Sequence, residues 1–249
     1  MMQVTSVADL AQSSRIFRPD VLNIFTDASI KRLGEHSWRG CAGAIGVYYN
    51  EDTNDYVTMT QLMLLKHCTN NIAELAGIEL GVDMALDYQY GFKRINLFSD
   101  SNISVHTYRE WIFAWCRNMG TYQSPERMGD LRTSSGKSVK NLTHILDTIN
   151  KICDIEQCEF NIYHCRGHHM NKLDEMITSF IKENKIKISK KEAVLLAYYN
   201  DMVDQETRDI VEHYFTENAY LGMIHEYSPY AVAPMNMAKY SKIIGGREF

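Results

Sequence analysis

The stretch Ile24–Phe25–Thr26–Asp27–Ala28–Ser29 decides the fold of this chain. Apolar and β-favouring residues run into one acid and then into two small residues, which is typical of a buried strand that ends in a carboxylate. The stretch Ile95–Asn96–Leu97–Phe98–Ser99–Asp100–Ser101 repeats the pattern further along the chain. Between them, Thr69–Asn70–Asn71–Ile72–Ala73–Glu74–Leu75 opens a helical pattern that carries a third acid.

The surrounding pattern predicts a sheet of five strands. Short polar turns join the first three strands, so these should pair antiparallel. A helix that begins at Asn71, with Glu74 in a capping box, leads to the fourth strand, and a strand-helix-strand crossover implies that strands one and four are parallel. Asp27 and Asp100 should then lie at the same edge of the sheet. The predicted strands cover residues 22–28, 41–49, 56–66, 94–99 and 159–164.

The remaining pattern divides the chain into three parts. Residues 1–20 read as an irregular lead-in, residues 21–184 as the main α/β domain, and residues 185–249 as a helical extension of unknown role. The extension has its own capping box at Ser189 and many aromatic residues, which favour packing on the domain or contact with a partner or a second copy. Within the domain, further helices are predicted at 101–117, 138–153 and 170–184, with a polar loop at 118–137.

The three acids suggest a metal site, because hard divalent cations prefer oxygen ligands. Each acid also has a plain structural interpretation. Asp27 fits a turn acid after a strand, and Glu74 fits the closing residue of its own capping box. Asp100 fits the cap of the next helix.

Composition narrows the class of protein. The chain has 249 residues, 45% of them hydrophobic and 23% charged, as in ordinary globular proteins. A net charge of −5 argues mildly against broad coating of nucleic acid. Six scattered cysteines without a CxxC pair favour a reducing compartment. No signal peptide is evident, and the longest late apolar run, 193–199, is too short to span a bilayer, so we expect a cytoplasmic protein without a membrane partner.

The order of the motifs TDAS, TNNIAEL, SDS and RGHH, followed by a helix acid, resembles the cellular type I ribonuclease H family over residues 21–184. The resemblance implies a five-stranded mixed sheet flanked by helices. It also implies an endoribonuclease that cuts the RNA strand of RNA–DNA hybrids with two Mg²⁺ or Mn²⁺ ions, leaves 3′-OH and 5′-phosphate ends, and removes RNA primers in DNA replication.

Carried over residue by residue, the resemblance implies that Asp27, Glu74, Asp100 and Asp174 hold the metal, with Glu175 as the alternative fourth acid. His168 would be a mobile catalytic histidine near the scissile phosphate. The implied nucleic-acid contacts are Asn70, Asn71, Ser101, Asn102, Trp111, Trp115 and Lys140. The two tryptophans, four residues apart on a predicted helix, are also typical core residues. Two other functions stay open: a related DNA exonuclease and a non-catalytic hybrid-binding protein.

Overall fold

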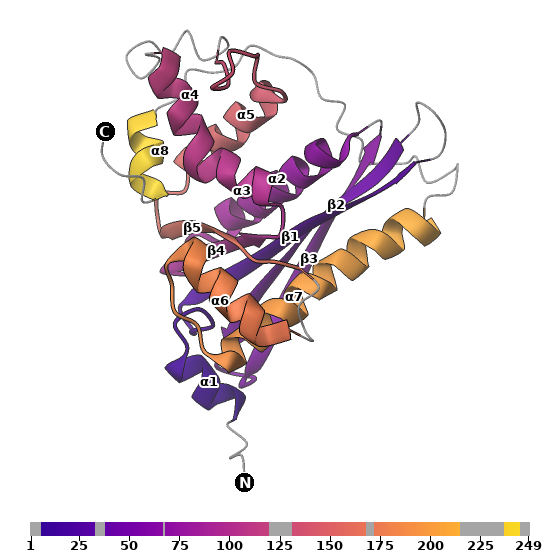
Figure 1. Cartoon of the computed structure of the whole chain (residues 1–249). Coiled ribbons are helices and arrows are strands. Elements are labelled where there is room, and N and C mark those ends of the chain that lie inside the picture. Colours follow the sequence, from indigo (N-terminus) through magenta and orange to yellow (C-terminus); the bar gives the residue numbers. More distant parts are fainter. Residues whose placement is uncertain are drawn as a thin grey trace.

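The computed structural model describes residues 6–32, 38–66, 68–119, 131–167, 172–214 and 237–244, and within them the predicted mixed sheet is present. Its strands lie in the order β3-β2-β1-β4-β5 (Figure 1). The first three pair antiparallel, and β4 and β5 extend the sheet in parallel with β1. The bounds are β1 (Val21–Arg32), β2 (Trp38–Asn50), β3 (Asp55–Lys66), β4 (Arg94–Ser99) and β5 (Glu159–His164).

Helices cover both faces of the sheet (Figure 1). On one face lie α2 (Asn70–Tyr88), α3 (Asn102–His106), α4 (Ile112–Met119), α5 (Leu142–Cys153) and α8 (Met237–Ile243). On the other lie α6 (Leu173–Asn184) and α7 (Lys190–Asp209), and α1 (Val7–Ser13) contacts β3. A π-helical turn at Thr107–Trp111 joins α3 to α4, and a second one at Ile210–Tyr214 extends α7.

Apolar side chains of the central strands point alternately to the two faces of the sheet and form a hydrophobic core on each face. On β1, Leu22 and Ile24 face the α2 side, whereas Phe25 faces the α7 side. On β4, Leu97 and Phe98 divide in the same way. This is the period-two pattern expected of a sheet buried on both faces.

A ladder of asparagines crosses the three parallel strands. Asn23, Asn96 and Asn161 stand side by side in register on β1, β4 and β5. Asn96 donates its side-chain N–H to Asn23 Oδ1 at 3.0 Å, and Asn161 donates to Asn96 Oδ1 at 3.4 Å. Asn23 in turn donates to the carbonyl of Ile16. The buried amides therefore satisfy one another, as buried polar groups must.

Residues 6–20 form regular and buried structure instead of the predicted irregular lead-in. Ser6 and Asp9 form a capping box at the start of α1, and Ile16 and Phe17 are buried. The capping serine lies three residues before an acid, a signal that the sequence reading left out. Residues 6–20 therefore belong to the domain.

Residues after 184 also belong to the domain core. The predicted helical extension begins with one helix, α7, which a π-helical turn continues to Tyr214. Ala193, Leu196 and Val203 pack with Phe25 and Phe98 of the sheet. A boundary at residue 184 would therefore cut through one core, and packing on the domain is the interpretation that α7 supports. Residues 215–236 and 245–249 lie outside the described residues.

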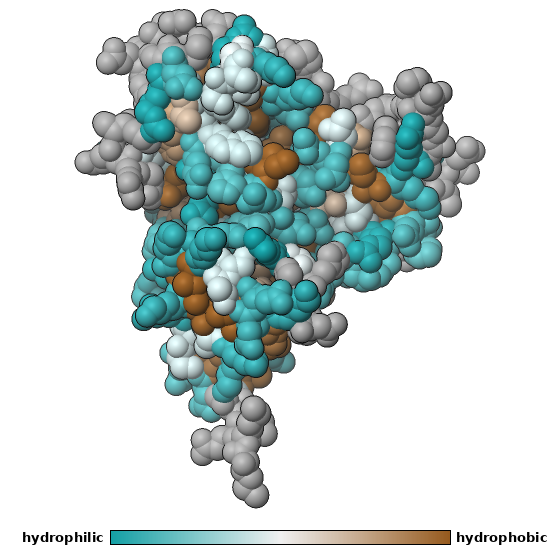
Figure 2. All heavy atoms as spheres, in the orientation of Figure 1, coloured by the Kyte–Doolittle hydropathy of each residue, from teal (hydrophilic) through white to brown (hydrophobic). Residues whose placement is uncertain are grey.

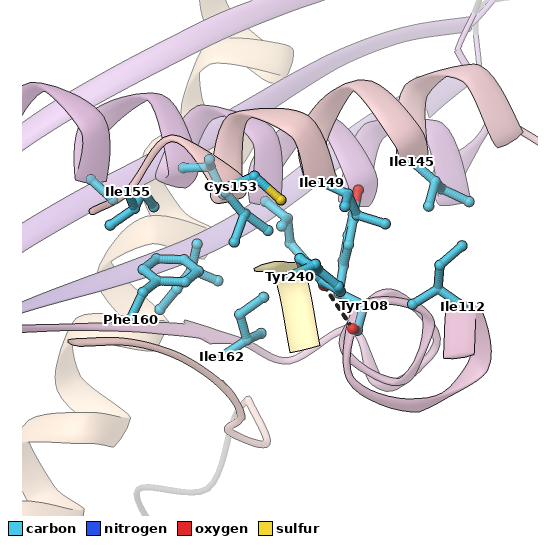
Figure 3. Close-up of a cluster of buried hydrophobic side chains, with 14 of the residues drawn as sticks. Tyr108, Ile112, Ile145, Ile149, Cys153, Ile155, Phe160, Ile162 and Tyr240 are labelled. Carbon is cyan, nitrogen blue, oxygen red and sulfur yellow. Dashed lines mark hydrogen bonds between the residues drawn. The ribbon is translucent and has the colours of Figure 1, made fainter. Parts of the chain in front are cut away.

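Helix α8 completes the core on the α2 face. Figure 3 shows Tyr240 among Ile149, Cys153 and Ile162, with its hydroxyl directed at Tyr108. Tyr240 is fully buried and donates its O–H to the carbonyl oxygen of Tyr108 at 2.7 Å. Its ring stacks on Phe113 with a centroid distance of 5.5 Å. The buried ring and its satisfied hydroxyl anchor α8 to the domain.

The outer surface is mostly polar on the face shown in Figure 2, where apolar residues form small separate patches. In the described parts of the chain, no helix combines the length and the apolar composition required to cross a membrane.

The carboxylate of Glu192 joins α7 to the N-terminal segment. Its side chain accepts hydrogen bonds from the Ser14 hydroxyl and from the main-chain N–H groups of Arg15 and Ile16. It also accepts two from Ser189, which closes the predicted capping box of α7. Burial raises the pKa of this carboxyl, but the hydrogen bonds from Ser14 and Ser189 outweigh burial and leave it below its usual range.

We predict that Glu192→Gln lowers the free energy of unfolding at pH 7 by about 2–3 kcal/mol, because hydrogen bonds to a charged acceptor are lost. Since the pKa is lower in the folded state, the stabilisation is present above the unfolded pKa near 4.5 and is lost as pH falls. The difference from wild type should therefore shrink in acid. Urea unfolding at pH 7 and pH 4 measures it, with the exposed Glu51→Gln as a matched control. An equal loss at both pH values would contradict the charged-acceptor explanation.

Candidate active site

The parallel pairing of β1 and β4 brings two acids together. Thr26 pairs with Ser99, so Asp27 and Asp100 follow at adjacent positions along the same edge. The main-chain carbonyl of Asp100 lies 3.1 Å from Nε2 of His164 at the end of β5, which holds the chain at this point. The sequence prediction that these two acids share one edge of the sheet is confirmed.

Helix α2 carries the third acid to the same place. Its cap is Thr69, whose hydroxyl accepts a hydrogen bond from the N–H of Ile72. The predicted capping box of Asn71 and Glu74 is therefore wrong, and Glu74 is released from a capping role. One turn later, Gly77 packs on β1: a Cβ there would lie 3.1 Å from the carbonyl oxygen of Asp27. The missing side chain permits the close approach of helix and strand.

A hydroxyl also caps the helix after β4. The side chain of Ser101 accepts from the N–H of Ser104 and begins α3. Asp100 is thus not the cap, and the plain interpretations of Asp100 and Glu74 both fail for the same reason. In each case a neighbouring hydroxyl does the capping.

Asp27, Glu74 and Asp100 form one cluster. One carboxylate oxygen from each lies within 4.8 Å of the others, and this is the group of possible metal ligands that the described residues contain. Burial, and then the charges of Asp100 and Glu74, raise the pKa of Asp27 to about 9. Burial and the charge of Asp100 raise the pKa of Glu74 to about 8. Crowded carboxylates that resist ionisation fit a site for divalent cations, whose charge removes the repulsion.

The structure does not bring the fourth expected acid to this cluster. Asp174 lies in the first turn of α6 with its side chain 89% exposed, 3.8 Å from Lys190 Nζ. The alternative, Glu175, is also exposed and lies near Lys172. Both line an open depression of about 640 Å³ with Arg166 and Lys182 on the outer side of α6. Neither side chain is placed to share an ion with Asp27.

Asp204 on α7 is an acid that the sequence reading missed. Its side chain is 16% exposed, forms an ion pair with Arg208, and contributes to the raised pKa of Asp27. A signal was available. Asn200, Asp204 and Thr207 interrupt the apolar stripe by which α7 packs on the sheet, and polar residues on a buried stripe are uncommon without a function.

A groove of about 300 Å³ begins beside the acids, at Asn71 and Leu75 of α2. It continues to Trp111 and Trp115, whose ring centroids lie 6.4 Å apart. Its other side consists of small polar and basic residues from the segment before α5: Thr133, Ser135, Lys137, Ser138, Lys140 and Asn141. Trp111 is 38% exposed, whereas Trp115 packs partly into the core. The groove combines exposed aromatic surface with hydroxyl and ammonium donors.

The other expected contact residues lie around the cluster. Asn70 and Asn71 are exposed at the start of α2, and Asn70 hydrogen-bonds Glu74 through its side chain. Ser101 and Asn102 stand next to Asp100. His168 lies outside the described residues, which end at Gly167 in this loop.

Comparison with known proteins identifies a family for the chain. A family model described as RNase H matches residues 19–211, which continues past residue 184 and includes all of α7. The fold is similar to LC9-RNase H1, a type 1 RNase H with the type 2 active-site motif, at 16% identity and a TM-score of 0.46, covering 75% of this chain and 86% of that one. None of the curated proteins compared with the chain matches it.

Two foamy viral structures are similar at the same level. The PFV RNase H domain has 16% identity and a TM-score of 0.45, covering 74% of this chain and 95% of that one. The foamy viral protease-reverse transcriptase, solved in complex with RNA/DNA hybrid, has 14% identity and a TM-score of 0.46, covering 73% of this chain and 20% of that one.

We predict that the cation-free protein loses stability as pH rises. The pKa values of Asp27 and Glu74 lie above their ordinary values of 3.8 and 4.5, so the folded state retains protons that the unfolded chain releases. The contribution of these two acids to stability should be full below about pH 4 and decline up to about pH 9. Asp27→Asn should flatten this decline and raise the melting temperature at pH 8–9 in chelator. The exposed Asp174→Asn is the control and should behave as wild type, whereas equal effects of both variants would contradict the cluster argument.

Proposed function

The chain belongs to the RNase H family, and on that premise we propose that it is an endoribonuclease that hydrolyses the RNA strand of RNA–DNA hybrids. The observation that supports this proposal is the cluster of Asp27, Glu74 and Asp100 at the point where the parallel pairing of β1 with β4 ends. Its position beside an aromatic and basic groove gives a long polyanionic substrate a place to lie.

The acids would bind two Mg²⁺ or Mn²⁺ ions. We assign the ligands to Asp27, Glu74 and Asp100, with Asp204 rather than Asp174 as the fourth acid, because Asp204 acts on Asp27 electrostatically and Asp174 faces solvent. When bound, the two cations would activate the attacking water and stabilise the leaving oxygen, giving 3′-OH and 5′-phosphate ends. The carboxylates would hold the ions with positions left open for water and phosphate.

Substrate choice would come from the polar residues around the cluster. The wide minor groove of an A-like duplex exposes the ribose 2′-OH, and Asn70 and Asn71 present amides beside Glu74 where such groups could be bound. Ser101 already caps α3, so its neighbour Asn102 is the freer of the two for contact with nucleic acid. Trp111, Trp115 and Lys140 would contact the second strand, through ring faces and a phosphate.

His168 keeps its proposed role as a mobile catalytic histidine. It follows Gly167, which directly abuts the carboxylate of Asp100. We further propose primer or hybrid removal during DNA replication as the biological role.

A substrate panel tests the proposed activity. The purified chain should cut an end-labelled RNA–DNA hybrid at internal positions in Mg²⁺ or Mn²⁺ and leave duplex DNA and single-stranded RNA intact. Shortening of a DNA strand from one end would instead identify an exonuclease. Binding of the hybrid without cleavage in either cation would identify a non-catalytic binding protein. Asp100→Asn, expected to be folded and inactive, controls for contaminating nuclease.

The assignment of the fourth acid gives a sharper prediction. Asp204→Asn should reduce hybrid cleavage roughly 10- to 100-fold, because a carboxylate that helps to hold the cations is lost. Asp174→Asn should cleave at the wild-type rate. Cleavage rates at saturating hybrid, with folding checked by circular dichroism, measure both variants. The reverse order of effects would return the role to Asp174.

A further inference from the structure

The side chain of Asn200 is buried without a hydrogen-bond partner. It lies on α7 with 1% of its surface exposed, and neither its Nδ2 nor its Oδ1 has a partner among the described residues. Leaving a buried amide unpaired is costly, so a position that served packing alone would be better filled by an apolar side chain. The protein carries this cost one helical turn before Asp204.

Asn200 and Asp100 approach the same point of the chain. A Cβ on Gly167 would lie 2.7 Å from Oδ2 of Asp100 and 3.0 Å from Nδ2 of Asn200. The amide nitrogen and the carboxylate oxygen therefore both border the space in which a side chain at position 167 would begin. A Cβ there would force Oδ2 of Asp100 to shift, because 2.7 Å is shorter than a normal contact.

Helix α7 brings polar side chains near two of the acids. Asn200 and Asp204 are separated by one helical turn and face the sheet together. Asp204 acts on Asp27 of β1, whereas Asn200 reaches toward Asp100, which follows the neighbouring strand β4. Helix α7 therefore presents one polar group toward each of these two acids.

We propose that Asn200 is a positioning residue: its amide is unpaired in the cation-free protein, and it donates an N–H to the carboxylate of Asp100 when a cation is bound, across the space left by Gly167. The inference rests on the proposed function of the cluster. A neutral donor suits this place, since another acid would add to the repulsion among the carboxylates, and an ammonium group would compete with the cation. The amide can orient the carboxylate of Asp100 without adding a charge to the cluster.

The test separates this role from a packing role. Asn200→Leu keeps the shape and removes the unpaired amide, so the cation-free protein should melt about 2–4 °C higher. The same variant should need roughly 10- to 100-fold more Mg²⁺ or Mn²⁺ for half-maximal thermal stabilisation, because the orientation of Asp100 is lost. The concentration of Mg²⁺ for half-maximal hybrid cleavage should rise in parallel.

Asn23→Leu is the matched control. Asn23 is equally buried, but both ends of its amide are hydrogen-bonded in the asparagine ladder. Its replacement should lower the melting temperature and leave the Mg²⁺ dependence unchanged. Asn200→Ala, which also lacks the donor, carries the test if Asn200→Leu does not fold.

The outcomes distinguish the two levels of the proposal. A wild-type protein that is neither stabilised by Mg²⁺ or Mn²⁺ nor active on hybrid overturns the proposed function and this inference together. A wild-type protein that responds to both, with Asn200→Leu or Asn200→Ala matching its cation dependence, overturns only the role of Asn200. A raised cation requirement in either folded variant, without a similar change in Asn23→Leu, supports the role.

Discussion

The mutual repulsion of three partly buried carboxylates is the constraint on which the rest of this structure depends. Asp27, Glu74 and Asp100 could separate only if the sheet or α2 gave way, and each is held by a local device. The pairing of β1 with β4 fixes the positions of Asp27 and Asp100. The contact of Gly77 with β1 fixes the position of Glu74. The hydroxyls of Thr69 and Ser101 cap α2 and α3, so neither Glu74 nor Asp100 serves as a helix cap. The fold thus crowds carboxyl groups that resist ionisation where a divalent cation would favour their charged forms.

Much of this could be predicted from the sequence. The strand pattern ending in Asp27 and Asp100 is local, and parallel pairing follows from the intervening helix, so the sheet order and two of the acids were within reach. Glu74 followed from its place at the start of α2, although the cap was assigned to the wrong residue. The error at Asp174 has a different origin. Both α6 and α7 are amphipathic helices after β5, and local pattern does not say which one lies over the acids.

Tertiary packing makes that choice. Helix α7 buries Leu196 and Val203 against Phe25 and Phe98, and so carries Asn200 and Asp204 to the sheet edge. Its first turn is joined to the N-terminal segment through the buried, 4% exposed Glu192. One helix therefore serves the core, the N-terminal segment and the candidate site. Changes that loosen the start of α7 should be felt at the acids some three turns away, because the helix moves as a unit.

The asparagine ladder has a consequence for how the chain folds. Asn23 and Asn96 are 73 residues apart, and Asn96 and Asn161 are 65 apart, so the central parallel strands must find each other across long stretches of intervening chain. Alternation of apolar residues penalises a slip of one residue but tolerates a slip of two, which keeps every side chain on its face. A slip of two would separate the three amides and bury them unpaired. The hydrogen bonds of the ladder thus favour one register of the parallel strands during folding. That register is the one that places Asp27 beside Asp100.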